Sequence, residues 1–182
     1  LGRHSDKDEL DWLDEQGPTS PALLRFLKRR QDAYDYILFF SYRYYHSFYG
    51  IRAHADKAIL VPTAEKDDVI HLEIFKELFQ LPRAIVYNSV EERAMIWTAT
   101  GNRRVYGEVV GVGSEVPTSI DAGLFRERCG DLTPYMIYIG RIDQNKGCRT
   151  LFNHYRRYRE DTGSNLSLVL VGGKKMDIPD TP

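Results

Sequence analysis

One stretch of the sequence decides the fold class and carries the strongest candidate for chemistry: Tyr135-Met136-Ile137-Tyr138-Ile139-Gly140-Arg141-Ile142-Asp143-Gln144-Asn145-Lys146-Gly147. Its apolar first part is typical of a buried strand that ends at Gly140, and Gly147 opens a helix. Ligands of open α/β sheets bind beyond the carboxyl ends of the strands. A turn from strand to helix also presents backbone amides and the positive end of the helix dipole. With Arg141 and Lys146 added, this turn is predicted to bind a phosphate or diphosphate.

The same two residues have a simpler interpretation as surface charges of a polar loop. The sequence contains neither the G-x-x-x-x-G-K-[ST] order of a Walker loop nor a G-x-G-x-x-G fingerprint. Spacing alone therefore leaves the ligand of the turn open.

The rest of the chain alternates between strand-like and helix-like stretches. Short runs rich in β-branched, aromatic and leucine residues predict strands at 34–40, 57–61, 84–88, 105–111, 135–139 and 166–171. Amphipathic spacing predicts helices over 21–30, 42–51 and 68–79, another from Ser89 and a last one after Gly147. Several strands are apolar at successive positions, which is typical of parallel sheets covered by helices on both faces. This alternation predicts an α/β protein with parallel sheets and right-handed crossovers.

The interval 113–133 is the most polar and glycine-rich part of the chain and predicts a connection between two sheets. We expect an N-terminal unit over residues 1–115, a connection over 116–134 and the start of a second unit over 135–182. The second unit is too short to bury a good core alone.

The segment G-R-I-D-x-x-K-G after a short apolar strand resembles the signature that opens the C-terminal domain of family 4, GT-B-fold glycosyltransferases. Three further segments resemble other parts of that family, and the resemblance runs continuously from about residue 34. They are Val109-Val110-Gly111-Val112-Gly113, Ala84-Ile85-Val86-Tyr87-Asn88-Ser89-Val90-Glu91-Glu92 and Leu168-Val169-Leu170-Val171-Gly172-Gly173.

The resemblance implies a GT-B fold of two Rossmann-like parallel-sheet units, both incomplete in this chain. It implies a retaining glycosyltransferase of the hexosyltransferase type, which moves a sugar from a nucleotide-diphosphate-sugar donor to a hydroxyl acceptor in glycan or glycolipid synthesis. In such enzymes the matching arginine and lysine hold the donor diphosphate without a metal ion or cofactor, a role that falls to Arg141 and Lys146. These charges would stabilise the leaving nucleotide in the transition state.

The resemblance also places three glycines, Gly113, Gly140 and Gly172, along the cleft. Many relatives have a histidine after the strand that matches 59–63, near the transferred sugar. Here that stretch reads Pro62-Thr63-Ala64-Glu65, so Glu65 is the candidate catalytic residue. The family's glutamate pair would follow Pro182, and its first glycine-rich loop would precede Leu1. We therefore expect a middle portion of the enzyme that is inactive alone.

Two alternatives remain open at this point. One is a catalytically dead module of the same fold that binds nucleotide sugars or acts as a scaffold. The other is a single flavodoxin-like domain, which predicts one continuous sheet across residues 113–133.

Composition narrows the partners and the location. The chain has 182 residues with 42% hydrophobic and 28% charged residues, which is typical of a globular protein. A formal net charge of −1 gives no overall attraction to nucleic acid, so the expected partners are a nucleotide sugar and a glycan or lipid-linked acceptor. The apolar runs have the length of strands and are too short for a membrane-spanning helix. The two cysteines make no disulfide framework, which favours the cytoplasm. The basic residues of 25–30 suggest peripheral contact with the inner face of the membrane.

Other polar clusters have structural interpretations. Ser89 and Glu92 form an S-x-x-E capping box, and the acidic residues of 6–15 are expected on a solvated helix face. The histidines show no ligand spacing that repeats with Cys129 or Cys148, so no metal site is expected.

Overall fold

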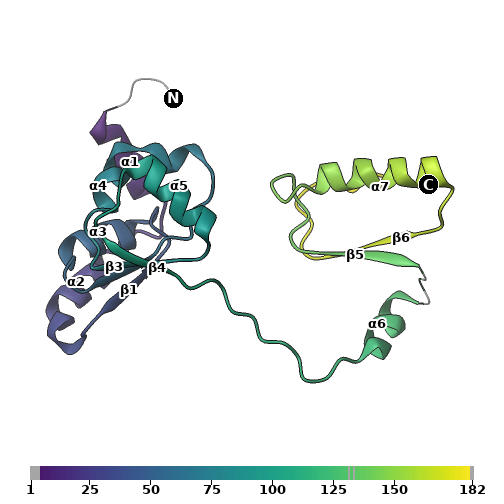
Figure 1. Ribbon diagram of the computed structural model, residues 1–182, viewed down its shortest axis with the longest axis horizontal. Coiled ribbons are helices and arrows are strands. Elements are labelled where there is room, and N and C mark those ends of the chain that lie inside the picture. The colour runs from purple at the N-terminus through teal and green to yellow at the C-terminus, as the bar shows by residue number, and fades with distance from the viewer. Residues whose placement is uncertain (1–4, 131, 133, 181–182) are drawn as a thin grey trace. The chain divides into compact units, whose positions relative to one another are not determined.

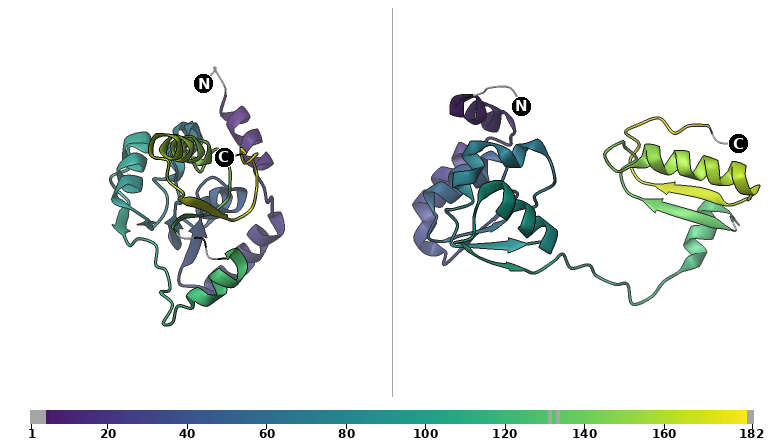
Figure 2. Two further views of the ribbon diagram at one scale, coloured as in Figure 1. Left: turned by 90° about the vertical axis from the view of Figure 1, so that its right-hand side faces the viewer. Right: turned by 45° about the horizontal axis from the view of Figure 1, so that its top comes forward.

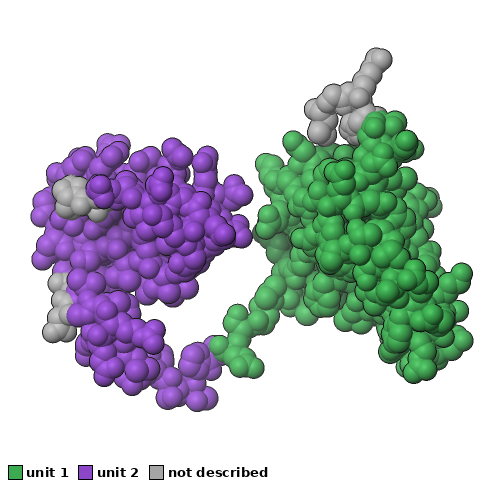
Figure 3. Space-filling model, turned by 180° about the vertical axis from the view of Figure 1, so that it is seen from behind, with its two compact units in different colours: residues 1–115 green, residues 116–182 purple. Residues whose placement is uncertain are grey.

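The structure is a computed structural model that describes residues 5–130, 132 and 134–180. The chain divides into two compact units, residues 1–115 and 116–182 (Figures 1 and 3). Parallel strands form a four-stranded sheet in the first unit and a two-stranded sheet in the second. The predicted α/β class with parallel sheets is therefore confirmed. Among the described residues the two sheets share no strand, so the alternative of one continuous sheet is wrong.

The sheet of the first unit has the strand order β1-β2-β3-β4, and all neighbours are parallel. Its strands are β1 (Ile37–Phe40), β2 (Ala58–Val61), β3 (Ala84–Tyr87) and β4 (Tyr106–Val109). Each lies within a predicted run but is shorter than it. At the end of β1, for example, Ser41 turns into the left-handed region with a φ of 64°.

The helices before the sheet are α1 (Asp6–Glu15) and α2 (Pro21–Arg30), and the 3-10 turn η1 (Gln31–Ala33) leads into β1. The crossovers contain α3 (Tyr45–Ala53), then η2 (Asp68–His71) with α4 (Glu73–Leu78), and then α5 (Val90–Thr100). The single helix predicted over 68–79 is wrong, because Leu72 is extended with a ψ of 140° and separates a 3-10 turn from a short α-helix.

Glu9 satisfies the start of that short helix. It is 3% exposed, and its carboxylate accepts a hydrogen bond from the Ile74 amide at 3.0 Å. The expectation of a solvated acidic face on α1 is therefore wrong for Glu9, because α4 has no side-chain cap of its own. Ser5 and Asp8 form a capping box at the start of α1.

The core of the first unit lies between the sheet and α3, α4 and α5. Each helix contributes buried side chains that pack against alternate strand residues such as Phe39, Leu60 and Ile85. The three crossovers run in one direction across the sheet, so right-handed connections place all three helices on the same face (Figures 1 and 2).

On the opposite face, the edge strands β1 and β4 leave apolar side chains exposed, whereas Val61 of the central strand β2 is 7% exposed. The row that contains Leu38 and Tyr106 and the next row, which contains Phe40, point to this face. Leu38 is 57% exposed, Phe40 59% and Tyr106 67%. The expectation that helices cover both faces is therefore wrong for the part of the first unit that the structure describes.

The second unit contains α6 (Ala122–Cys129), β5 (Tyr135–Ile139), α7 (Cys148–Thr162) and β6 (Ser167–Val171). Its small core joins Ile142, Cys148 and Phe152 to strand residues beneath α7. On the other face, Ile139 is 74% exposed. The helix α6 lies within the interval predicted as a connection, and Phe125 stacks on Tyr135 with ring centroids 5.0 Å apart.

Candidate functional site

The turn between β5 and α7 lies at the carboxyl end of the two-stranded sheet, beside the turn that follows β6. The Gly140 amide donates to the Val171 carbonyl at 2.9 Å, and the Ile142 amide donates to the Gly173 carbonyl at 2.9 Å. The ladder of hydrogen bonds thus continues past the strands and holds both turns together. Arg141 lies between these two bonds, at the edge where open α/β sheets bind ligands.

Two glycines allow the turns to approach. Gly172 has a φ of 145°, and a Cβ there would overlap the carbonyl oxygen of Gly140. Gly140 itself has a φ of 151°, a conformation that side chains rarely adopt. The predicted residues Gly140 and Gly172 therefore lie in two adjoining turns, and Gly140 precedes Arg141 in the first of them.

Asp143 organises the turn from within. Its carboxylate accepts a hydrogen bond from the Lys146 amide at 2.8 Å and forms an ion pair with the Arg141 guanidinium. The hydrogen bond from Arg141, and after it that from the Lys146 amide, holds the pKa of Asp143 below its usual value. Arg141 is thus fixed in the turn with a side chain that is 54% exposed, and Asp143 balances part of its charge.

The start of α7 adds donors to this turn. Gly147 precedes the helix and offers no side-chain cap, so the amides of Arg149 and Thr150 have no hydrogen-bond partner among the described residues. Lys146 is exposed, and its ammonium group has no partner among the residues that the structure describes. The structure therefore brings Arg141, Lys146 and the positive end of a 15-residue helix into one turn, which suits an anion.

A cavity of the second unit is lined by other residues. It has a volume of 480 Å³ and lies along α7, where Arg149, Phe152, Asn153 and Met176 line it. Neither Arg141 nor Lys146 belongs to its lining. The two predicted residues instead lie on the exposed surface of the turn.

A second candidate site lies in the first unit, at the carboxyl ends of β1 and β2. Glu65 lines a cavity of 290 Å³ there, together with Ser41, Arg43, Thr63 and Asp67 among others. Arg43 and Asp67 form an ion pair at 3.0 Å. The Glu65 carboxylate has no partner among the described residues, so it remains able to accept a hydrogen bond.

Backbone strain marks this second site. Ser41 has a φ of 64° and Thr63 a φ of 49°, and a β-branched residue in this region is an outlier. The Ser41 amide donates to the Val61 carbonyl at 2.9 Å, and the Tyr42 amide to the Pro62 carbonyl at 3.1 Å. Each strained residue costs about 1–3 kcal/mol, and such strain gathers at functional sites.

Glu92 ties the loops of the first unit together. The predicted capping box is half formed: Ser89 Oγ accepts a hydrogen bond from the Glu92 amide at 3.0 Å, but the Glu92 carboxylate does not return to Ser89. It accepts hydrogen bonds from the amides of Asn88 and Ala64, both at 2.6 Å. Glu92 is 7% exposed, so this buried carboxylate joins the loops that follow β2 and β3.

The remaining predicted glycine, Gly113, lies in an irregular segment. A Cβ there would meet no atom within 4 Å, so the local structure does not require glycine at this position. Among the described residues, no group of three histidine, cysteine or carboxylate side chains could hold a metal ion.

Several residues of the two sites are not singled out by the sequence pattern. Asp143 has a recognisable signal, because an aspartate a few residues before a helix commonly accepts hydrogen bonds from turn amides. The Arg43–Asp67 pair and the strain at Thr63 have no local signal, since both depend on how neighbouring loops meet.

Comparison with protein-family models and with curated proteins found no match to this chain. Within the described residues, no helix combines the length and apolar character that crossing a membrane requires.

Proposed function

We propose that this chain is part of a GT-B-fold glycosyltransferase that transfers a hexose from a nucleotide-diphosphate-sugar donor to a hydroxyl acceptor, with retention of configuration. One observation carries the proposal: the turn after β5 combines Arg141, Lys146 and the uncapped start of α7 at the carboxyl end of a parallel sheet. Arginine can bind two phosphate oxygens at once, and lysine adds a mobile charge.

The chemistry follows from the charges of the turn. Negative charge grows on the diphosphate as the glycosidic bond breaks, and positive groups already in position stabilise that transition state. In this proposal Asp143 orients Arg141, and the amides that open α7 donate hydrogen bonds to a phosphate oxygen. The reaction then needs neither a metal ion nor a cofactor.

The first unit would bind the acceptor, a glycan or a lipid-linked hydroxyl compound. Glu65 is the candidate catalytic residue because it lines the strained polar cavity at the carboxyl ends of β1 and β2. The proposed location is the cytoplasm, with peripheral contact at the inner face of the membrane.

A second candidate is a catalytically dead module that binds nucleotide sugars or serves as a scaffold. The Arg141–Asp143 ion pair favours it, since this pair balances part of the charge that a donor diphosphate would need. Turnover of a nucleotide sugar by the full-length protein separates the two, because the dead module binds without transferring sugar.

The test is the affinity of the protein for UDP, GDP and ADP, measured by calorimetry. We expect one of these to bind, and Arg141→Ala and Lys146→Ala each to weaken its binding about fivefold to tenfold, as exposed charge-assisted hydrogen bonds contribute. Arg156→Ala, an exposed arginine farther along α7, is the matched control and should leave the affinity unchanged. Equal affinities for the parent and both variants would contradict the assignment.

A further inference from the structure

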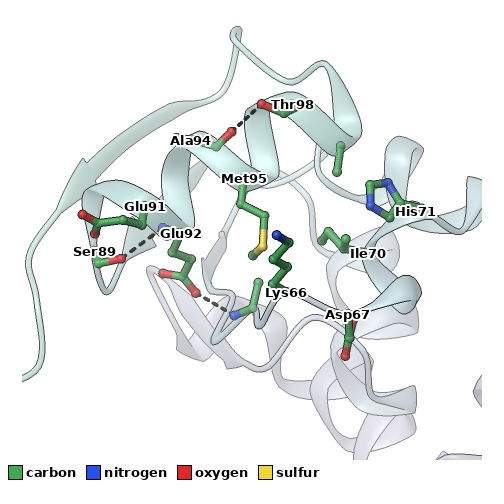
Figure 4. A pocket seen from close by; sticks show the side chains of 12 residues that line it. Lys66, Asp67, Ile70, His71, Ser89, Glu91, Glu92, Ala94, Met95 and Thr98 are labelled. Carbon is green, nitrogen blue, oxygen red and sulfur yellow. Dashed lines mark hydrogen bonds between the residues drawn. The ribbon is translucent and has the colours of Figure 1, made fainter.

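A further cavity of the first unit adjoins the Glu65 site and shares Asp67 with it. It has a volume of 620 Å³ and lies between α5 and the segment 64–71 (Figure 4). Ile70, Met95 and Ala99 give it an apolar floor, and Ala64 and Ala94 add small apolar side chains. Small-molecule pockets are typically about 300–1,000 Å³ and mostly apolar, so its size and lining are those of a ligand pocket.

Most polar groups of the lining already have partners within the protein. Thr98 Oγ1 donates to the Ala94 carbonyl at 2.8 Å, and Ser89 Oγ accepts from the Glu92 amide at 3.0 Å. The Glu92 carboxylate is held by the Ala64 and Asn88 amides. A ligand therefore gains little from these groups.

Asp67, a further acidic residue of the lining, is also occupied. It pairs with Arg43 at 3.0 Å and accepts a hydrogen bond from the Val69 amide at 3.1 Å. In Figure 4 the Glu91 carboxylate is directed away from Met95. Neither the Asp67 nor the Glu91 carboxylate therefore offers a binding partner inside the apolar part of the pocket.

Two basic side chains remain. Lys66 extends toward Met95 in Figure 4, and the His71 imidazole stands on the same side of the pocket as Ile70. Neither side chain has a partner among the described residues. Lys66 therefore remains available to a ligand as a cation, and the ring nitrogens of His71 remain available for hydrogen bonds.

We infer that this pocket binds a small anionic amphiphile, with its apolar body on Ile70 and Met95 and its acidic group at Lys66. A phosphate or a carboxylate would satisfy the same recognition. The inference rests on the lining of the first unit alone, and it stands whether or not the second unit binds a nucleotide.

The methionine methyl groups provide the test. The chain has three methionines, of which only Met95 lies in the first unit, while Met136 and Met176 lie in the second. With ¹³C-methyl-labelled methionine, octyl phosphate below its micelle concentration should shift the Met95 signal saturably and leave the other two in place. Octyltrimethylammonium, which has the same chain and the opposite charge, should bind at least about fivefold more weakly, since one exposed charge pair accounts for that difference.

Two variants complete the experiment. Lys66→Gln removes the charge without adding a methionine signal, so it should weaken the binding of octyl phosphate about threefold to tenfold. Lys7→Gln, at an exposed lysine of α1, should leave that binding unchanged. Ala94→Phe fills the pocket from an exposed helix position and should abolish the Met95 shift. Tryptophan fluorescence verifies that the variants are folded. A Met95 signal that stays in place, or equal binding of the two octyl compounds, overturns the inference.

Discussion

Glu92→Gln tests whether a buried carboxylate holds the carboxyl edge of the first unit together. The two hydrogen bonds of 2.6 Å from Ala64 and Asn88 both end on the Glu92 carboxylate. Glutamine keeps the shape but offers one oxygen, so its NH₂ group would face a second N–H donor. A hydrogen bond to a charged group contributes about 1.5–3 kcal/mol, and an unsatisfied buried donor costs about 1–3 kcal/mol. We therefore expect the free energy of unfolding to fall by about 3 kcal/mol.

Urea unfolding followed by tryptophan fluorescence measures this loss selectively, because Trp12 and Trp97 are the only tryptophans and both lie in the first unit. Glu91→Gln is the matched control: it removes the same charge from an exposed neighbour, so it should change the free energy of unfolding by less than about 0.5 kcal/mol. If Glu92→Gln lowers the free energy of unfolding no more than this control does, the bridging role of Glu92 is refuted.

Two further predictions concern strain and charge. Thr63→Gly should raise the free energy of unfolding by about 1 kcal/mol in the same assay, because relief of about 1–3 kcal/mol of strain exceeds the entropic cost of glycine; a decrease would show that Thr63 is not strained. Asp143 has a pKa below its usual value of 3.8, so its contribution to stability is present above that pH and is lost as the pH falls through the lowered pKa. Asp143→Asn should therefore weaken the acid dependence of the second unit, followed by the Met136 and Met176 methyl signals, and identical acid transitions in parent and variant would contradict this.

Local sequence patterns were sufficient to predict the parallel α/β class and the approximate position of each strand that the structure describes. The stretch 135–147 predicts the strand, the turn and the helix that the structure contains, because apolar runs and glycines act over a few residues. The helix over 68–79 could not be predicted correctly, since its break at Leu72 is stabilised by Glu9, which is distant in the sequence. The apolar pattern of residues 68–79 does not indicate that a carboxylate on another helix will bind there.

The candidate sites likewise combine features that the local sequence predicts with features that depend on distant contacts. The sequence predicts that Arg141 and Lys146 share a turn, and the structure places them there, but the ion pair with Asp143 appears only in three dimensions. The site around Glu65 depends on the left-handed Ser41 and Thr63, and neither residue type favours that conformation strongly enough to be recognised in advance. Residue propensities cannot predict backbone strain that neighbouring loops impose.

The described helices cover only one face of the first sheet, so apolar side chains on its other face affect the wetting of the surface more than the stability of the core. Leu38, Phe40 and Tyr106 satisfy the alternation of a β-strand, yet their side chains remain largely hydrated in the unit. Their apolar character therefore adds little to the cohesion of this core, while it sets how readily the surface is wetted. Evolution or engineering could alter these three positions for solubility with little effect on the chain's ability to fold.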